Sequence, residues 1–597
     1  MQQTPSAEFG VKGGGAINVV MKSGTNQLHG SAYDFRHDAW TDAANFFVSR
    51  SGGGTTPVKN QQYGGTFGGP IVKDQTFYFG NYEGQRLAVT SPYTVQVPTA
   101  AEISAARARI AAAGLTTNPI GERLLQYYPT DPSGKLTVDA ANIANMNTFG
   151  VKIDHQLTPN NQLNGRFFWG SSFQSAAQNG QLTPANGPRD LFNTVTNPTR
   201  VALVGAVWNA TLSPHALIET RLGYNRISLT LDVNNKIDPT SLGINTGALD
   251  PADFGVPFVT LGNFGAIGGA GTNPQSTTPT ETWDVSTALT ETRGQHTIKM
   301  GGNWQLGKSH RIRNSARSTF TVTGGTQDDV DSLVGLLLGR FGRASRSFGS
   351  TDRHLSQHSF GAFINDQWNV TARVMVSGGL RYDLHLPLTE AHDQAANFLP
   401  GQGLVRVGQG LEELYRADTT NVGPRAGVAW DITGDGRTSL RAGYSLTYDL
   451  PEFKTFSMGL AGLAGGASAF TQPNLGVFSV TLMGSRLHKP DSARATCLDP
   501  NTGASGDYDY VCVQPGVPIY GSSPTGAPPF NAFAIPDHYS TPMYHYFHVT
   551  LQREVFKGNA VTVTYLGSRG RDLSWFRDIN GPPLGTPLDA IQQHRPY

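Results

Sequence analysis

The stretch His296-Thr-Ile-Lys-Met-Gly-Gly-Asn-Trp-Gln-Leu306 carries its large apolar side chains at every second position. Successive side chains of a β-strand point to opposite faces, so this pattern predicts a strand with one apolar and one polar face. The run is longer than the average globular strand of about 5–6 residues and matches the ~9–11 residues of a tilted membrane-spanning strand. The stretch therefore favours an all-β protein whose strands cross a membrane.

The same alternation recurs along the chain, and the links between the runs differ in length. We count about fifteen strands, three before Thr148 and twelve after it. From Thr148 onward, short and long links alternate along the chain. The short links lie near residues 158–161, 212–215, 292–295, 369–372, 432–436 and 557–559, and the long links cover residues 170–200, 232–281, 309–357, 387–422 and 450–544. Short turns at one rim and long loops at the other are typical of an outer-membrane barrel.

Composition excludes several classes of protein. The 597-residue chain has a formal net charge of +1, so it lacks the basic excess expected of a nucleic-acid-binding protein. Charged residues make up 15% and aromatic residues 10%, whereas disordered chains are rich in charge and poor in aromatics. Residues 1–10 contain no basic-then-apolar signal peptide, and no apolar run approaches the ~18 residues of a membrane helix. A cytosolic protein would fit these two absences, and so would part of a membrane barrel.

One long link, residues 87–147, contains a predicted helical insert. Thr99 and Glu102 have the spacing of a capping box, and Gly114 can end the helix that follows. The apolar face of this helix consists of Ile103, Ala106, Ile110 and Ala113. A second short helix is predicted over residues 119–128, with Asn118 as its N-cap and proline at its first position.

The opening segment Gly13-Gly-Gly-Ala-Ile-Asn-Val-Val-Met-Lys-Ser-Gly-Thr-Asn-Gln-Leu-His-Gly-Ser31 resembles the junction between plug and barrel in TonB-dependent outer-membrane transporters, and more narrowly their Oar-like branch. Further segments resemble that branch in the same order. They are Asn45-Phe-Phe47, Gln62-Tyr-Gly-Gly-Thr-Phe-Gly-Gly-Pro-Ile-Val-Lys-Asp74, Thr76-Phe-Tyr-Phe-Gly-Asn-Tyr-Glu-Gly84, Phe363-Ile-Asn-Asp-Gln-Trp368, Gly379-Leu-Arg-Tyr-Asp383, Pro424-Arg-Ala-Gly427 and Ser439-Leu-Arg-Ala-Gly-Tyr444.

The resemblance implies an antiparallel transmembrane β-barrel of about 22 strands with an N-terminal plug, energised through the inner-membrane TonB complex. On this basis residues 1–24 are the end of the plug, residues 25–568 are a partial barrel with long extracellular loops, and residues 569–597 begin a further extracellular loop. We expect this chain to be an incomplete barrel, a fragment that lacks the TonB-contacting box and the closing strands. Such a fragment is not expected to transport on its own.

Two groups of residues are candidate site residues. The polar faces of the strands should line the lumen and contact the plug or the cargo. These lumen-facing candidates are Lys152, Asp154, Lys299, Asn303, Arg381, Asp383, Arg437 and Arg441. Cys497 and Cys512 lie in the longest loop, and in an oxidising exterior they should form a disulfide. By the chain-entropy model this bond would contribute on the order of 3 kcal/mol; two free thiols are the alternative.

Four other motifs have simpler explanations than the chemistry they resemble. Residues 302–309 match the phosphate-loop pattern, but they lie within an alternating strand and no helical face follows. His354 and His358 have the spacing of a helical zinc pair, but on a strand they would lie ~13 Å apart, so we interpret them as solvated rim histidines. Residues 431–436 read as a hairpin turn rather than a calcium loop. Residues 326–331 could bind calcium but read as the cap of a short helix through residues 334–338.

These observations lead to three hypotheses for function. The first is a TonB-dependent transporter or receptor in the outer membrane of a Gram-negative-type bacterium, which takes up an unidentified extracellular ligand. Its partners would be outer-membrane lipid and, for the full-length protein, the TonB complex. The second is a structural or adhesive barrel that binds partners through its loops. The third is a secreted all-β carbohydrate enzyme. We find no nucleophile elbow or zinc-protease motif, and we expect no enzyme activity, no cofactor, no metal and no nucleic-acid partner.

Overall fold

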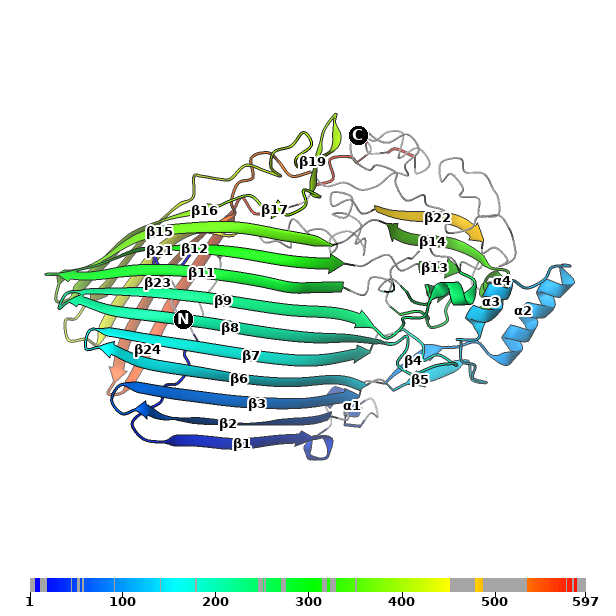
Figure 1. Ribbon diagram of the computed structural model, residues 1–597, viewed down its shortest axis with the longest axis horizontal. Helices are drawn as coiled ribbons and strands as arrows, with labels where there is room; N and C mark the ends of the chain where they lie inside the picture. Colours follow the sequence, from blue (N-terminus) through cyan, green and yellow to red (C-terminus); the bar gives the residue numbers. More distant parts are fainter. Residues whose placement is uncertain are drawn as a thin grey trace.

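The computed structural model describes residues 6–10 and 19–587, with breaks at residues 44–45, 51–53, 56–57, 91, 140, 178–179, 245–250, 252–253, 270–274, 314–318, 323–328, 349–351, 451–477, 487–533, 576, 582 and 584. One large antiparallel sheet dominates it (Figure 1). A small lobe of helices and short strands stands beyond one end of the long strands. None of the described helices combines the length and the apolar character needed to cross a membrane.

Fifteen long strands form this sheet, and each pairs with the next long strand along the chain. In sheet order they are β1 (His29–Asp38), β2 (Val58–Val72), β3 (Thr76–Thr90), β6 (Ala141–Thr158), β7 (Asn161–Ala177), β8 (Thr194–Ser213), β9 (Ala216–Val233), β11 (Gln275–Arg293), β12 (His296–Arg313), β15 (Arg353–Thr371), β16 (Val374–His385), β20 (Val422–Asp431), β21 (Thr438–Tyr448), β23 (Met543–Phe556) and β24 (Asn559–Arg571). The predicted fold class and strand count are confirmed.

The alternation of side chains puts an apolar surface on the outside of the sheet. Met300, Ile364 and Leu380 lie in register on three adjacent strands, and each is exposed by 38–51%. Aromatic pairs such as Tyr224 and Trp283, with ring centroids 4.3 Å apart, lie on the same face. Exposed apolar rows in the middle of long strands are what lipid-facing barrel strands present.

The two ends of the sheet differ as predicted. Six tight turns, one for each predicted short link after Thr148, join consecutive long strands at one end, and the long connections all leave from the other end. The turn between β20 and β21 is one of them. There the Asp431 carboxylate accepts hydrogen bonds from the backbone N–H groups of Gly434 and Gly436, both at 2.9 Å. The hairpin interpretation of residues 431–436 is therefore confirmed.

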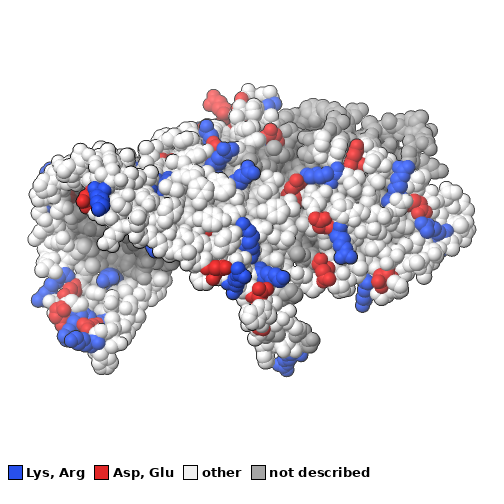
Figure 2. Space-filling view, turned by 60° about the horizontal axis from the view of Figure 1, so that its bottom comes forward, with Lys and Arg blue, Asp and Glu red and all other residues white. Residues whose placement is uncertain are grey.

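The sheet is not closed into a barrel. β1 pairs with β2 and β24 pairs with β23, and within the described residues neither edge strand has a second neighbour. The sheet nevertheless curls, so that β21, β23 and β24 lie behind β6 to β9 in Figure 1. Lys or Arg and Asp or Glu side chains lie next to one another over the face in Figure 2, without a large patch of one sign.

The lobe is built by four long loops together with β22. Its elements are β4 (Tyr93–Gln96), α2 (Ala100–Ala112), α3 (Pro119–Leu125), β5 (Lys135–Val138), η2 (Pro239–Leu242), β10 (Phe258–Leu261), β13 (Thr319–Val322), α4 (Asp329–Leu337), β14 (Arg340–Phe348) and β22 (Phe478–Arg486). Their apolar residues form one shared core, in which Leu124, Val259 and Leu333 are fully buried. The lobe is therefore a folded unit rather than a set of separate loops.

The remaining short elements are η1 (Ala39–Thr41), α1 (Phe46–Arg50), β17 (Thr389–Glu390), β18 (Ala396–Leu399) and β19 (Gly403–Arg406). β17 pairs with the loop end of β15, and β18 pairs with β19.

The predicted helical insert is present, with one change of boundary, and a separately predicted helix begins earlier than expected. Thr99 and Glu102 form the complete capping box of α2, and the Asn118 side chain caps α3. α3 ends at Leu125 rather than at residue 128, because the chain tightens there: the Tyr127 and Tyr128 N–H groups bond to the carbonyls three residues back. The helix expected over residues 334–338 begins earlier, since α4 spans Asp329–Leu337.

The phosphate-loop-like residues 302–309 lie wholly within β12, as the strand interpretation predicted. Residues 326–328 of the calcium candidate lie outside the described residues, as do Cys497 and Cys512. The disulfide therefore stays a prediction.

Candidate functional site

The N-terminal segment of residues 6–10 lies against the inward face of the sheet. Ala7 is fully buried and packs with Ala288 of β11 and Phe363 of β15. Both partners belong to the polar-facing side of their strands, opposite the apolar surface described above. The interior of the curled sheet is thus occupied by a piece of the same chain from far away in the sequence.

Arg381 of β16 is the centre of this contact. Its Nε donates to both carboxylate oxygens of Asp383, at 2.9 and 3.0 Å, and its Nη2 donates to Asn303 Oδ1 at 2.8 Å. Its Nη1 donates to the backbone carbonyls of Ala7 and Glu8, both at 3.3 Å. The side chain is 1% exposed and that of Asp383 is 4% exposed. A buried guanidinium needs such a complete set of acceptors, because an unpaired buried charge is costly.

Three more charged side chains hold the segment. Arg425 of β20 donates to the backbone carbonyls of Ser6 and Phe9. The Glu8 carboxylate accepts from Lys299 Nζ at 2.5 Å and lies 3.6 Å from Arg221 Nη1. The two arginines Arg381 and Arg425 therefore bind main-chain oxygens, whereas Glu8 is the only side chain in the segment that forms ion pairs among the described residues.

Glycines make room for this arrangement. A Cβ atom on Gly10 or on Gly361 would collide with the Arg381 guanidinium. A Cβ atom on Gly379 would lie 2.7 Å from Asn365 Oδ1 and 3.2 Å from the Ala7 Cβ. Because these glycines have no side chain, the inward face has room for both the N-terminal segment and the Arg381 guanidinium.

Residues 19–28 continue along the inward face toward the tight-turn end. Lys152 of β6 donates to Ser23 Oγ at 2.7 Å and pairs with Asp154 at 3.1 Å. Gly24 approaches the backbone of β2 and β3 so closely that a Cβ atom there would collide with the carbonyl of Tyr78. The chain then reaches the β2–β3 turn, where Asn26 accepts from the Asp74 backbone N–H at 2.8 Å.

The eight lumen candidates fall into four positions. Lys299, Asn303, Arg381 and Asp383 come together around residues 6–10. Lys152 and Asp154 come together around Ser23. Arg441 lies on β21 at a position whose register matches the inward face, but Arg437 lies in the β20–β21 turn, 69% exposed, with Asp435 and Glu554 as its nearest carboxylates.

Sequence reasoning did not identify Glu8, Arg221 or Arg425 as site residues. A usable signal exists for Arg425, since it alternates with Pro424 and Ala426 as Arg381 does with its neighbours. Arg221 lies on the same inward face of β9. Glu8 carries no such signal, because the opening residues have no period that relates them to a strand.

The site is made of fixed cationic donors and a segment that they hold. Arg381 has all its donor nitrogens engaged. What the arrangement can do is bind a stretch of backbone inside the sheet.

Comparisons with known proteins agree with this architecture. A family model described as an outer membrane beta barrel domain matches residues 20–597. A 79-residue part of the chain is 33% identical to the TonB-dependent transporter Oar of Myxococcus xanthus, which is 13% of this chain and 7% of that protein.

Among solved structures, the outer membrane transporter YddB from Escherichia coli is similar with a TM-score of 0.47 and 10% identity, covering 89% of this chain and 50% of that chain. A ferric enterobactin receptor (PfeA) mutant from Pseudomonas aeruginosa is similar with a TM-score of 0.47 and 13% identity, covering 96% of this chain and 57% of that chain. The chain thus spans about half the length of these solved proteins and a small part of the curated relative. Since the family model covers nearly the whole chain, this protein belongs to the outer membrane beta barrel family, and its place is the outer membrane of a Gram-negative bacterium.

Proposed function

We propose that this chain is the barrel portion of an Oar-like TonB-dependent transporter, which takes up an extracellular ligand through its lumen. In this proposal residues 1–24 are the end of the plug, residues 25–568 form the barrel with its loops, and residues 569–597 begin a further loop. One observation carries the proposal: residues 6–10 lie inside the curled sheet, where Arg381, Arg425 and Lys299 bind them. We call these three side chains the plug seat.

The chemistry of this seat suits a plug that must move. Two arginines bind the segment through its carbonyl oxygens, so they recognise the backbone of a turn, closed by the bond from the Phe9 N–H to the Ser6 carbonyl, rather than particular side chains. Hydrogen bonds to charged groups are worth about 1.5–3 kcal/mol each. Several of them together hold the segment firmly at rest, and a pull from the periplasmic side would break them one after another.

The extracellular lobe is the proposed capture surface. It stands at the long-loop end, which in this family of barrels faces the exterior. Its own hydrophobic core makes it rigid enough to present a defined surface. A ligand held there would lie above the mouth of the lumen, with the plug seat below it.

A second candidate is a structural or adhesive barrel that binds partners through the same lobe and does not transport. The folded lobe favours this candidate as much as the first. The family match is to an integral outer-membrane domain, and this argues against the secreted, water-soluble carbohydrate enzyme. We propose a non-catalytic role in either case.

Movement of the plug end distinguishes the two. Ala7→Cys places a thiol at a position that is fully buried in the resting state. In energised cells of the native host, a transporter should expose this thiol to a membrane-impermeant maleimide, and dissipating the proton gradient should abolish the labelling. Gln402→Cys, in the exposed turn between β18 and β19, is the control for reagent access. Labelling of the Ala7→Cys variant that is independent of energy would support the adhesive barrel instead.

A further inference from the structure

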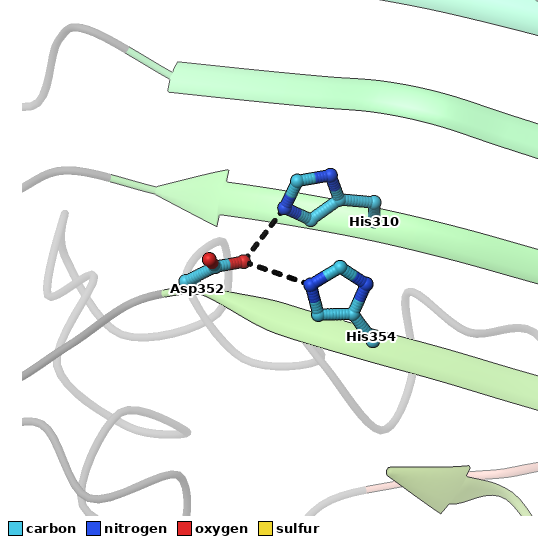
Figure 3. A group of neighbouring side chains, drawn as sticks. All are labelled: His310, Asp352 and His354. Atoms are coloured by element: carbon cyan, nitrogen blue, oxygen red, sulfur yellow. Dashed lines mark hydrogen bonds and ion pairs between the residues drawn. The ribbon is translucent and has the colours of Figure 1, made fainter. Parts of the chain in front are cut away.

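His310, Asp352 and His354 meet at the long-loop rim of the sheet (Figure 3). His310 lies on β12 and is directly opposite His354 on β15 in the strand register. Asp352 directly precedes β15 and lies beside the two rings, with one carboxylate oxygen directed at a nitrogen of each. Directly opposite residues of an antiparallel pair share one face and have Cβ atoms ~4.5–5.5 Å apart. The sheet itself therefore brings the two imidazoles together.

The ligand atoms of these three residues already converge. Asp352 Oδ1 is 2.7 Å from His310 Nε2 and 3.6 Å from His354 Nε2. The two rings are stacked, with centroids 4.1 Å apart and planes 12° apart. One ligand atom from each residue lies within 4.8 Å of the other two. Tetrahedral ligands of a zinc ion lie ~3.3 Å from one another, given Zn–N and Zn–O distances of ~2.0–2.2 Å, so small rotations of the side chains would close the site.

A third histidine stands beside this group. The His392 ring lies edge-on to the His354 ring, with centroids 5.4 Å apart. The backbone on which it sits is tied to β15, because the Ala391 N–H donates to the His354 carbonyl at 2.9 Å. His392 follows β17, which pairs with β15 at the same end. His392 therefore borders the three converging residues, although its own ligand atoms lie outside the 4.8 Å group.

A buried carboxylate supports the arrangement from behind. The Glu390 side chain is 1% exposed and lies 3.6 Å from His392 Nδ1. Its oxygens also accept from the backbone N–H groups of His354, His392 and Gln394, at 3.2, 3.0 and 2.8 Å. Metal-binding histidines usually have one ring nitrogen oriented by a carboxylate, which leaves the other nitrogen as the ligand. The Glu390 carboxylate faces His392 Nδ1 at 3.6 Å, beyond hydrogen-bonding distance, and its hydrogen bonds fix the backbone of both His354 and His392.

We propose that His310, Asp352 and His354, with His392 as a fourth ligand, bind a divalent transition-metal ion at the extracellular rim. Imidazole and carboxylate ligands suit Zn²⁺, Cu²⁺ and Ni²⁺. Three histidines and one aspartate would make a closed four-ligand site on two adjacent strands and the loop after β17. The bound ion would join that loop to the sheet.

His354 and His358 have the i, i+4 spacing of a helical metal pair, but His358 is not part of this site. His358 lies four residues farther along β15, where its Nδ1 accepts from Trp304 Nε1 at 3.2 Å. The second histidine of the site is on the neighbouring strand instead. This makes His358 a matched control, since it is a histidine on the same face of the same strand.

The test is a calorimetric titration of the full chain with Zn²⁺ as the only added ligand. The protein is in detergent and carries no histidine tag. We expect one saturable site. His310→Ala, His354→Ala and Asp352→Asn should each weaken Zn²⁺ binding at least tenfold, His392→Ala should weaken it less, and His358→Ala should leave it unchanged. X-ray absorption of the Zn²⁺-loaded protein should show nitrogen and oxygen ligands, with at least two imidazoles.

Circular dichroism of each variant checks that the strands are intact. If a variant misfolds, His310→Gln and His354→Gln replace it, since glutamine keeps the size and polarity of the side chain at these positions. The absence of saturable binding of Zn²⁺, Cu²⁺ and Ni²⁺ at millimolar concentration would overturn the proposal. Binding that survives in both the His310 and the His354 variants would overturn it equally.

Discussion

Lys299 and Glu8, which are 291 positions apart in the sequence, form an ion pair with Nζ 2.5 Å from Oε2. The pair joins the inward face of β12 to the N-terminal segment, and both side chains are mostly buried, 29% and 16% exposed. It is the side-chain contact that complements the arginine bonds to the backbone of the same segment.

Removing the charge of Glu8 should loosen the segment. Glu8→Gln is expected to cost about 1.5 kcal/mol of docking free energy, since a hydrogen bond to a charged group contributes about that much. Hydrogen exchange of the amides of residues 6–10 should then be roughly tenfold faster. Arg293→Gln, which removes the exposed pair of Arg293 with Glu291, is the control and should change nothing in this segment. Unchanged exchange in Glu8→Gln would show that the arginines alone hold it.

Replacing Arg381 alone should reduce the stability of the protein far more than replacing Arg381 and Asp383 together. Arg381→Met leaves the Asp383 carboxylate buried without its main partner, and breaking a buried pair in this way costs on the order of 3–5 kcal/mol. The double variant Arg381→Met/Asp383→Leu should recover a large part of the loss. Denaturant unfolding in detergent micelles measures both. Equal losses in the single and double variants would mean that the contacts with Asn303 and the N-terminal segment dominate.

Two adjacent glycines offer a matched pair of substitutions. A Cβ atom on Gly379 would press against Asn365 and Ala7, whereas a Cβ atom on Gly378 would meet nothing within 4 Å. Gly379→Ala should therefore displace residues 6–10, with a cost of about 1–3 kcal/mol for overpacking, and Gly378→Ala should be neutral. Protease protection of the N-terminal segment reads out the difference. A similar effect of both substitutions would point to strand propensity and not to the lack of room at Gly379.

The stability of the loop between β19 and β20 should depend on pH through Asp418. Partial burial raises the pKa of this carboxyl, but hydrogen bonds from Thr420 and Thr541 outweigh it, so the pKa lies below its ordinary value. A lowered pKa in the folded state gives stability that is present above the ordinary pKa and is lost as the pH falls through the folded value. Proteolysis of residues 407–421 should thus rise below about pH 4.

Asp418→Asn tests the assignment. The variant should show the faster proteolysis already at neutral pH and should lose the acid dependence. An acid dependence that persists in the variant would assign the effect to another carboxyl group.

The lobe should unfold without the sheet. Leu124→Ala empties a fully buried position of the lobe core, and a large-to-small change of this kind costs about 2–5 kcal/mol. Hydrogen exchange should accelerate in α2, α3 and α4 and stay unchanged in β6 to β12. Ile364→Ala on the exposed outer face of β15 is the control. Any faster hydrogen exchange in this variant should be confined to the sheet, and exchange in α2, α3 and α4 should stay unchanged. Acceleration in both regions after Leu124→Ala would show that lobe and sheet unfold as one unit.

The sequence predicts the strands well because their signal is local. A strand that faces lipid on one side must alternate, and a tight turn must use the residues found at 431–436. Alternation also predicts that Arg381 and Asp383 share a face with Lys299 and Asn303 only if the strands are in the right register. Arg437 is a position where alternation gives the wrong place. It continues the spacing of the polar residues of the strand, but β21 begins at Thr438 and Arg437 lies in the preceding turn.

What could not be predicted depends on contacts between distant segments. Glu8 has no pattern that relates it to β12, and His310 meets His354 only because two strands separated by a long loop pair in one particular register. The lobe is the extreme case, since none of its loops shows by composition that its apolar residues pack against those of the other three.

That shared core has a consequence for how the protein folds. Contacts between α2 and α4 connect chain segments more than 200 residues apart, and contacts of such high sequence separation form late and slowly. None of the four loops contains enough of the core to fold alone, so the lobe can assemble only after the strands from β3 to β15 have paired and brought the loops to one rim. Until then its apolar surfaces are exposed to the aqueous phase outside the membrane, where they are open to aggregation. Completion of the lobe would therefore be the last step of maturation, and an antibody against its assembled surface would report that the sheet beneath it is correctly paired.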